Sequence, residues 1–405
     1  MNIQLTYHRR PTSTTNVGGL LIGSEHPIRI QTMANTSTND IEGSVAQAKR
    51  CIDAGTQLLR FTTQGMREVE SLAQIRTALC GMVQQGGGAC SMVPLVADVH
   101  FQSDVADAAA KVVEKVRINP GNYIDPARKF KQIDYTEEEY QSELMRLRAR
   151  FVQLLDICKE HKTAIRLGVN HGSLSDRIMS RYGDTPEGMV ESCMEFLRVA
   201  VAEDFKDIVL SIKASNTRVM VTTVRLLVWQ MQEEGMAFPL HLGVTEAGEG
   251  EDGRVKSAVG IGALLADGIG DTIRVSLSEA PEKELPVARA LVDYFADNQS
   301  IRYTKDTLVR VEEKTVYYSN ADTDWAMYQL HAAAECGRLL WDYHCDELVL
   351  RNDNFAAEDL ERLSKDILQA ARVCMYKTEY ISCPGCGRTL FDLEQTIAQV
   401  KAATS

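Results

Sequence analysis

Residues 239–277 read PLHLGVTEAGEGEDGRVKSAVGIGALLADGIGDTIRVSL and contain one complete strand–helix–strand unit. Two short runs rich in apolar and β-branched residues, PLHLGV and DTIRVSL, flank an apolar segment of helical period. The glycines of residues 260–270 lie within and after this segment, so we interpret them as helix-packing and helix-stop positions. No GxGxxG or GxxxxGKS/T loop follows an early strand, which disfavours a nucleotide-binding sheet.

The same alternation of short strands and longer helical segments covers residues 1–299. The predicted strands begin at Ile28, Gln57, Val93, Glu114, Thr163, Asp207, Pro239 and Asp271. Helix ends carry local signals: Asp40 precedes a helical face that stops at Gly55, and Thr136 with Glu139 forms a capping box. Eight strand–helix pairs in roughly 300 residues match a (β/α)8 barrel, whose usual size is about 250 residues. The sequence therefore predicts an α/β protein built on a TIM barrel.

The composition is that of a folded, acidic protein. Hydrophobic residues make up 44% and charged residues 25% of the 405 positions, which excludes a disordered or low-complexity chain. The formal net charge of -12 disfavours binding to nucleic acid or anionic membranes through bulk charge. An anionic ligand would need a local cluster of cations.

The cysteines and the start of the chain indicate a reducing compartment. Ten cysteines in 405 residues are sparse, and most lie singly in apolar periodic segments, as core residues do. The opening residues MNIQLTYHRR lack targeting features, and no run of about 18 apolar residues follows. We expect a cytoplasmic protein.

Five of the eight predicted strands carry a cation near the C-terminal end, where a buried parallel strand should be apolar. These cations are Arg60, Arg117, Arg166, Lys213 and Arg274. The C-terminal rim of a TIM barrel holds the active site, and like charges there cost several kcal/mol without anions. Asp98 and Glu246 supply only two counter-charges. Rim salt bridges could explain any one cation, but the set favours a phosphorylated or diphosphorylated substrate.

Polar residues follow one predicted strand after another. They include Asp98, His100, Asn119, Asn122, Asn170, His171, Ser215, Glu246 and Ser276. Glu246 is the carboxylate best placed for proton transfer, because nearby cations would keep it ionised until a proton is needed. We interpret His241, inside a strand, as a core residue.

The segment CPGCGR places Cys383 and Cys386 on one tight turn, where both thiolates can face one metal. A CxxC turn is shared by zinc sites, dithiol redox sites and iron–sulfur clusters. Zinc would require a second ligand pair, which the sequence lacks, and a cluster requires three or four ligands. The spacing of Cys336, Cys345 and Cys374 matches no ligand run. We predict a barrel over residues 1–299, an α-rich connecting module over 300–377, and the start of a C-terminal α/β domain over 378–405.

Seven segments together resemble the 4-hydroxy-3-methylbut-2-enyl diphosphate synthase family, the iron–sulfur reductases of the methylerythritol phosphate route to isoprenoids. They are PIRIQTMANTST, VPLVADVHF, VRINPGN, IRLGVNHGSL, LSIKASN, residues 241–278 and KTEYISCPGCGRTLFDL. They are most similar to the larger, plant- and chlamydia-like branch, which carries an extra domain between the barrel and the cluster domain.

This resemblance implies a TIM barrel that binds 2-C-methyl-D-erythritol 2,4-cyclodiphosphate and a C-terminal domain that holds a 4Fe-4S cluster. Two electrons from ferredoxin or flavodoxin would open the ring and remove one oxygen as water. By resemblance, the substrate-binding residues would be the five cations with Asn119, Asn170, Ser215 and Ser276, next to Asp98, His100 and His171. The acid/base residue would be Glu246, and two cluster ligands would be Cys383 and Cys386. We expect a homodimer for the full-length protein.

The sequence departs from the family in two places. The family continues beyond the CxxC helix to a GCxVNGPGE-like segment with a third cysteine and a glutamate ligand, whereas this sequence ends at Ser405. Residues 300–377 are also too few for the full extra domain. We therefore expect a C-terminal loss or an internal deletion, with substrate binding but an incomplete cluster. The alternatives are a barrel for a phosphorylated metabolite with a zinc-binding CxxC, and a scaffold without a cluster that only binds substrate.

Overall fold

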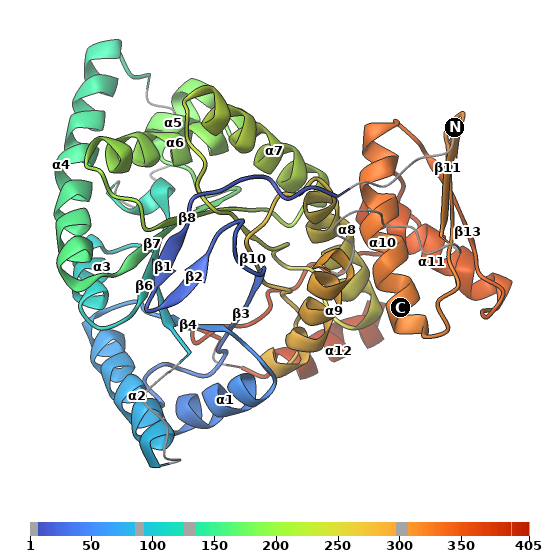
Figure 1. Ribbon diagram of the computed structural model, residues 1–405, viewed down its shortest axis with the longest axis horizontal. Helices are drawn as coiled ribbons and strands as arrows, with labels where there is room; N and C mark the ends of the chain where they lie inside the picture. The colour runs from blue at the N-terminus through green and yellow to red at the C-terminus, as the bar shows by residue number, and fades with distance from the viewer. Residues whose placement is uncertain (1–6, 86–92, 125–133, 297–306, 390, 405) are drawn as a thin grey trace.

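The computed structural model describes residues 7–85, 93–124, 134–296, 307–389 and 391–404, and its centre is a parallel barrel (Figure 1). The barrel strands are β3 (Arg29–Met33), β4 (Leu58–Thr62), β5 (Leu95–Asp98), β6 (Lys115–Ile118), β7 (Ala164–Asn170), β8 (Ile208–Lys213), β9 (His241–Leu242) and β10 (Thr272–Ile273). Each of them overlaps one of the eight predicted strand segments, and only β7 extends beyond its segment, by two residues, so the predicted TIM barrel is confirmed.

The strand order around the barrel is β8-β7-β6-β5-β4-β3-β10-β9, and each neighbouring pair is parallel. The two ends of this sheet meet through a parallel bridge between Leu210 and Leu240. The amide of Leu210 donates to the carbonyl oxygen of Pro239 over 2.9 Å. The sheet therefore closes on itself.

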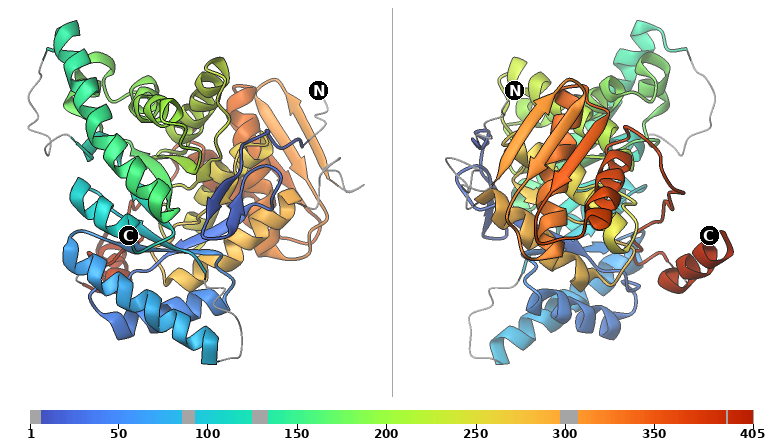
Figure 2. Two further views of the ribbon diagram at one scale, coloured as in Figure 1. Left: turned by 60° about the vertical axis from the view of Figure 1, so that its left-hand side comes forward. Right: turned by 90° about the vertical axis from the view of Figure 1, so that its right-hand side faces the viewer.

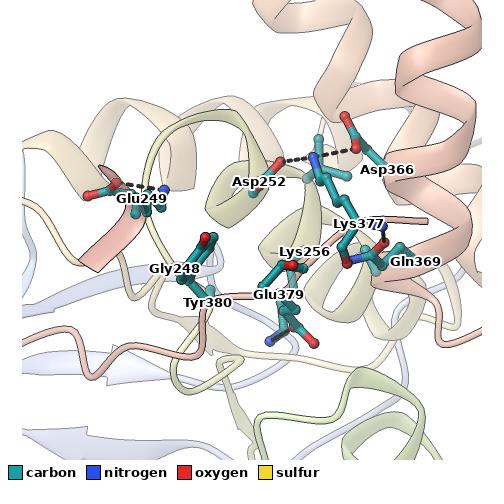
Figure 3. A pocket seen from close by; sticks show the side chains of 14 residues that line it. Gly248, Glu249, Asp252, Lys256, Asp366, Gln369, Lys377, Glu379 and Tyr380 are labelled. Atoms are coloured by element: carbon teal, nitrogen blue, oxygen red, sulfur yellow. Dashed lines mark hydrogen bonds and ion pairs between the residues drawn. The ribbon is translucent and has the colours of Figure 1, made fainter. Parts of the chain in front are cut away.

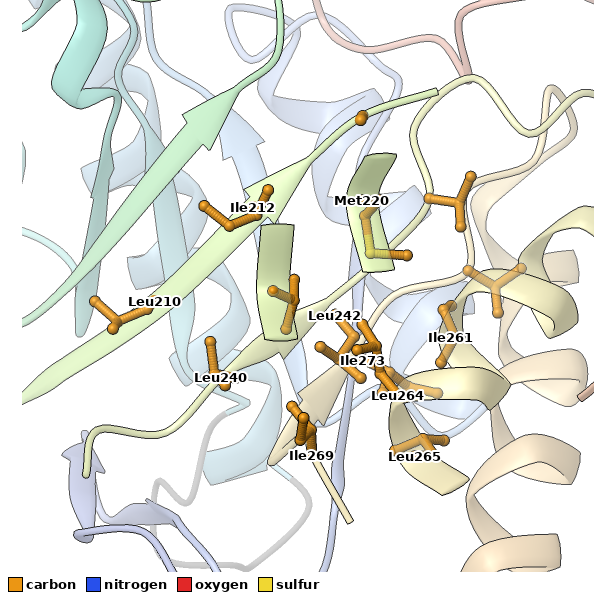
Figure 4. Close-up of a cluster of buried hydrophobic side chains, with 14 of the residues drawn as sticks. Leu210, Ile212, Met220, Leu240, Leu242, Ile261, Leu264, Leu265, Ile269 and Ile273 are labelled. Carbon is orange, nitrogen blue, oxygen red and sulfur yellow. The ribbon is translucent and has the colours of Figure 1, made fainter. Parts of the chain in front are cut away.

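Helices between the strands form the outer ring. They are α1 (Ile41–Asp53), α2 (Met66–Gln85), α3 (Ser103–Ala110), α4 (Glu137–His161), α5 (Asp176–Tyr182), α6 (Pro186–Ala202), α7 (Thr217–Glu233), α8 (Gly250–Ala266) and α9 (Glu284–Ala296). The predicted cap at Asp40 and the capping box of Thr136 and Glu139 are both present. Figure 4 shows how outward-facing strand residues such as Leu242 and Ile273 pack against Ile261 and Leu264 of α8.

A hairpin of β1 (Thr15–Val17) and β2 (Leu20–Ile22) covers the N-terminal end of the barrel. Its Val17 and Ile22 are completely buried and belong to one apolar cluster with inward-facing strand residues. The other buried members of this cluster are Leu58, Val96, Ala164 and Val209. Apolar packing thus fills the end of the barrel opposite to the predicted cations.

Residues 307–371 form a module of three strands and two helices beside the barrel (Figure 2). Strands β11 (Leu308–Glu312) and β12 (Thr315–Ser319) are antiparallel, and β13 (Glu347–Arg351) pairs in parallel with β12. Helix α10 (Trp325–Asp342) packs on α8, and α11 (Ala357–Ala370) follows β13. A Cβ on Gly262 of α8 would lie 2.5 Å from Ala334 of α10, so the two helices require glycine there. The sequence did not predict β13.

Residues 372–389 form an extended segment, which we call the strap, and α12 (Leu393–Thr404) follows it. Figure 2 shows α12 standing at the edge of the molecule, and Ile397 is its one buried side chain. Among the described residues, no helix is long and apolar enough to cross a membrane.

Candidate active site

The strap lies across the C-terminal mouth of the barrel. The hydroxyl groups of Ser278, beyond β10, and Ser382, in the strap, are 2.6 Å apart. Ser278 Oγ also lies 3.2 Å from the carbonyl oxygen of Cys383 and donates to it. A Cβ on Gly387 would lie 2.8 Å from the carbonyl oxygen of Thr36, so only glycine lets the strap come this close. The CxxC turn is therefore held over the strand ends.

A cavity of about 740 Å³, including its opening to solvent, lies between the strap and the barrel. Ten of the sequence-predicted site residues line it: Arg60, Asp98, His100, Asn170, Lys213, Glu246, Arg274, Ser276, Cys383 and Cys386. The remaining lining residues are Met33, His241, Gly243, Thr245, Pro384, Gly385 and Arg388. Three of the five strand cations, Arg60, Lys213 and Arg274, thus line the same cavity as the CxxC turn.

Five predicted residues do not line this cavity: Arg117 and Arg166 are completely buried in the barrel, and Asn119, His171 and Ser215 follow the strand ends. Asn119 accepts a hydrogen bond from the amide of Gly121 and donates to Ser173 Oγ, so both ends of its amide hold the loop after β6. His171 is exposed and lies 3.9 Å from Asp184. Ser215 is half-buried in the loop after β8 and does not line the cavity.

Asp98 is an acidic centre below the cavity. Its carboxylate oxygens lie 3.6 Å from Arg60 Nε, 3.2 Å from Arg117 Nη1 and 3.4 Å from His100 Nε2. Burial by itself raises the pKa of Asp98, but the charges of Arg60 and Arg117 outweigh burial and hold this pKa well below its usual range. Asp98 is therefore ionised.

His100 is neutral in this setting. Burial, followed by the charge of Arg117, lowers the pKa of His100 to about 4. A neutral imidazole nitrogen can accept the hydrogen bond from Arg117 Nη1, which lies 2.8 Å from His100 Nε2. Arg117 Nη2 donates to the carbonyl oxygen of Gly168 and to Asn170 Oδ1. Arg117 is completely buried beneath the cavity, and this network holds both of its terminal nitrogens.

Arg166 and Lys213 have no anionic partner among the described residues. Arg166 is completely buried, and its Nε donates to Ser211 Oγ over 3.0 Å. Neither of its Nη atoms has a hydrogen-bond partner in the described part of the chain. Burial and then the neighbouring arginines lower the pKa of Arg166 and of Lys213 well below their usual ranges. Buried, unpaired guanidinium nitrogens are costly, and an anion that reached them would be stabilised by charge-assisted hydrogen bonds.

Arg274 is paired within the protein, which the sequence analysis did not foresee. Its Nε and Nη2 lie 3.2 Å and 3.0 Å from the two carboxylate oxygens of Glu284, the first residue of α9. Glu284 is 2% exposed and also accepts hydrogen bonds from Thr32 Oγ1 and the Leu277 amide. The sequence analysis counted two counter-charges at the mouth, Asp98 and Glu246. That number was too low, because Glu284 provides a third.

We expect the substitution Glu284→Gln to lower the free energy of unfolding by about 3–5 kcal/mol, because it leaves Arg274 buried without its counter-charge. Chemical denaturation measures this loss. Glu282→Gln is the matched control, since Glu282 pairs with Arg50 near the surface and should cost less than about 1 kcal/mol. Equal losses in the two variants would contradict this account of the site.

Arg388 is a site residue that the sequence analysis missed, although it belongs to the quoted turn CPGCGR. Its Nε lies 3.4 Å from Cys386 Sγ and donates to it. Burial raises the pKa of Cys386, but the hydrogen bonds and the charge of Arg388 outweigh burial, so the pKa is lowered. His241 is buried as predicted, and it also lines the cavity.

Glu246 lies on the loop after β9, with its backbone in the left-handed region at a φ of 56°. Its side chain lines the cavity and makes no hydrogen bond or ion pair with the described part of the chain. Its carbonyl oxygen accepts from Lys256 Nζ over 3.3 Å, and Lys256 also pairs with Glu379 of the strap over 2.8 Å. A strained backbone at a cavity wall is typical of functional positions.

Ion pairs around a second, smaller cavity attach the strap to α8 and α11 (Figure 3). Lys377 Nζ lies 2.7 Å from Asp252 and 2.6 Å from Asp366. Glu379 is paired with Arg372 as well as with Lys256. These contacts join the strap, the barrel and the module at one point.

Cys383 and Cys386 fit an iron–sulfur group only in part. Cys383 is exposed and Cys386 is buried beside Arg388, and both line the cavity. The described ranges contain no group of three or more histidine, cysteine, aspartate or glutamate side chains that could hold a metal. The two thiols can therefore supply two ligands, whereas a cluster needs three or four.

Fold and site together define a TIM-barrel protein with a cation-lined C-terminal mouth covered by a CxxC turn. The model of the GcpE TIM-barrel domain matches residues 12–289. The 4-hydroxy-3-methylbut-2-en-1-yl diphosphate synthase (flavodoxin) of Bacteroides thetaiotaomicron is 45% identical over 545 aligned positions, which cover 98% of this chain and 88% of that protein. The Porphyromonas gingivalis protein of the same name is 40% identical, with 98% and 87% covered.

The chloroplastic ferredoxin-type enzyme of Arabidopsis thaliana is 51% identical over 285 residues, which cover 70% of this chain and 38% of that protein. The chain therefore belongs to the 4-hydroxy-3-methylbut-2-enyl diphosphate synthase family. This family membership confirms the resemblance inferred from the sequence.

Proposed function

We propose that this protein binds 2-C-methyl-D-erythritol 2,4-cyclodiphosphate and takes part in its reduction to 4-hydroxy-3-methylbut-2-enyl diphosphate. The reaction consumes two electrons and two protons and releases one water. One observation carries the proposal: the CxxC turn of the strap and the cations Arg60, Lys213 and Arg274 of three barrel strands line a single cavity. A metabolite barrel with a remote zinc site would not need this convergence.

In this proposal, the oxyanions of the substrate lie against Arg60, Arg166 and Lys213. Among the described residues, Arg60 Nη1, Lys213 Nζ and both Nη atoms of Arg166 have no partner. Arg60 and Lys213 line the cavity, whereas Arg166 is completely buried next to them and contributes its charge from behind the cavity wall. Arg117, Asp98 and His100 contact one another, so they form a fixed surface against which the diphosphate binds. Charge-assisted hydrogen bonds from buried arginines provide both affinity and orientation.

Glu246 supplies a proton to the departing oxygen. Its carboxylate lines the same cavity as the cations and makes no internal contact, so it is free to exchange a proton with a bound substrate. Asn170 and Ser276 line the cavity as hydrogen-bonding groups for the sugar hydroxyls, and the CxxC turn of the strap lines the same cavity. We propose no such contact for Asn119, His171 or Ser215, because they lie outside this cavity.

An iron–sulfur group would deliver the electrons, with Cys383 and Cys386 as two of its ligands. The enzymes of this family are iron–sulfur proteins, and their names give flavodoxin or ferredoxin as electron donor. The described donor set is incomplete for a cluster, so we assign no step to it. The 4Fe-4S type, the domain bounds 1–299, 300–377 and 378–405, the homodimer and the cytoplasmic location stay predictions.

Anaerobic reconstitution with iron and sulfide tests the proposal. We expect iron binding, with visible absorption and a paramagnetic signal after reduction, and we expect Cys383→Ser and Cys386→Ser to abolish all three. Cys374→Ser is the matched control, because Cys374 is partly exposed and does not line the cavity. Stoichiometric zinc without iron would contradict the proposal and favour a structural zinc site.

A further inference from the structure

Beneath the cavity, the barrel interior contains a cluster of buried polar side chains, which we call the floor cluster. A TIM-barrel interior is ordinarily filled by branched apolar residues. The floor cluster instead consists of Gln31 of β3, Lys115 of β6, Arg166 of β7 and His241 of β9, each at most 3% exposed. Lys115 has no role in the function proposed above, nor did the sequence analysis single it out.

Lys115 has no counter-charge in the described structure. Its side chain is 0% exposed, and its one hydrogen bond is a long one, 3.4 Å from Nζ to Gln31 Oε1. No carboxylate of the described residues lies within ion-pair distance of it. An ammonium group in such a place is strongly disfavoured, because it has lost its water without gaining an anion.

The groups that face Lys115 are themselves cationic or neutral. Arg60 on β4 and Arg166 on β7 act on it electrostatically, His241 on β9 shares the same surroundings, and Arg117 lies two residues further along its own strand. Burial, followed by Arg166 and Arg60, lowers the pKa of Lys115 well below its usual range. In the empty barrel, burial and these neighbours therefore disfavour the ammonium form of Lys115.

An anion bound next to the floor cluster would favour the ammonium form of Lys115. The unpartnered donors here are Arg60 Nη1, both Nη atoms of Arg166 and Gln31 Nε2, and they come from three strands. Diphosphate oxygens that satisfy the arginines would bring negative charge close to Lys115. We propose that Lys115 takes up a proton when a diphosphate-class anion enters the cavity, so that anion binding and protonation of Lys115 are linked. This inference rests on the anion site of the proposed function.

The linkage has a definite sign. If binding takes up one proton on Lys115, the association constant contributed by this step falls about tenfold for each unit rise in pH. The effect extends from the pKa of Lys115 in the empty barrel up to its pKa in the occupied barrel. An anion that also titrates adds its own pH dependence, which is removed by comparison with a variant that lacks the amine.

Calorimetric titration with inorganic pyrophosphate, in two buffers of different ionisation enthalpy at pH 8, counts the protons taken up. We expect the wild type to take up about one proton more than Lys115→Met, whose side chain is similar in length and uncharged. Lys111→Met is the matched control, because Lys111 is exposed on the same strand–helix unit and should keep the wild-type count. Lys115→Gln provides a second variant if methionine disturbs folding.

Equal proton counts in the wild type and in both Lys115 variants would overturn the inference and leave the anion site intact. The inference would also be overturned if Lys213→Met lost the extra proton uptake and Lys115→Met kept it. Lys213 at the cavity wall would then be the group that takes up the proton. A wild-type protein that does not bind pyrophosphate would overturn the anion site together with the inference. Failure of the proton linkage and failure of the anion site therefore give different results.

Discussion

The substitution Arg166→Met will lower the affinity for pyrophosphate and for the cyclic diphosphate about a hundredfold or more, without lowering the free energy of unfolding. Both Nη atoms of Arg166 are buried and unpartnered, so in the empty protein they contribute cost rather than contacts. Removing one member of a buried, hydrogen-bonded charge pair costs about 2–5 kcal/mol of binding. Stability should stay constant or rise, because methionine buries no charge.

Calorimetric titration and chemical denaturation on the same samples check both parts of this prediction. Arg76→Met is the surface control, since Arg76 pairs with Glu114 outside the cavity and should keep wild-type affinity. Arg117→Met provides the contrast: it should lose stability as well as affinity, because Asp98 and Asn170 would lose a bonded partner. Wild-type affinity in Arg166→Met would refute the placement of the diphosphate.

The substitution Glu246→Gln will lower the turnover of the reconstituted protein by about 10²–10⁴-fold while the affinity for the cyclic diphosphate stays within a few-fold. Glutamine keeps the size of the side chain and removes its ability to exchange a proton. The left-handed backbone at this position constrains the side chain of either residue in the same way. Product formation with chemically reduced flavodoxin measures turnover, and calorimetry measures affinity.

Glu249→Gln is the matched control for this second prediction. Glu249 lies on the same loop, three residues further on, but its carboxylate pairs with Lys401 over 2.7 Å and does not line the cavity. It should keep wild-type turnover. If Glu246→Gln keeps wild-type turnover, the proton comes from another group or from solvent. Parallel losses of affinity and turnover would instead show that Glu246 binds substrate rather than acting on it.

Local sequence was sufficient to predict the barrel. Strand runs such as QLLRFT and TAIRLG alternate with helices whose caps can be recognised in the sequence, and each such unit packs in the same way against its neighbours. The module was predicted less well. Strand β13 has an alternating pattern over only five residues, ELVLR, and it becomes a strand because β12 offers it a parallel edge. Such pairing between distant segments leaves little local signal.

The candidate site was predictable where residues break a rule of the fold. Arg60 and Arg166 were found because a buried strand should not carry a charge, and this violation can be recognised without any knowledge of contacts. Glu284 and Lys115 were missed for opposite reasons. Glu284 opens a helix, where an acidic residue is common, and Lys115 lies in the sequence KVRI beside a cation that had already drawn attention.

The amino-acid sequence by itself determined the TIM barrel, the cationic strand ends and the CxxC turn of this protein, because periodicity and spacing are local properties. Only the tertiary structure decided which cations are neutralised. It paired Arg274 with Glu284 and Arg117 with Asp98, and among the residues that the structure describes it gave Arg166 and Lys115 no carboxylate partner. The charge state of a buried group depends on the loss of its water and on neighbouring groups from other strands. Only closure of the barrel brings these neighbouring groups together.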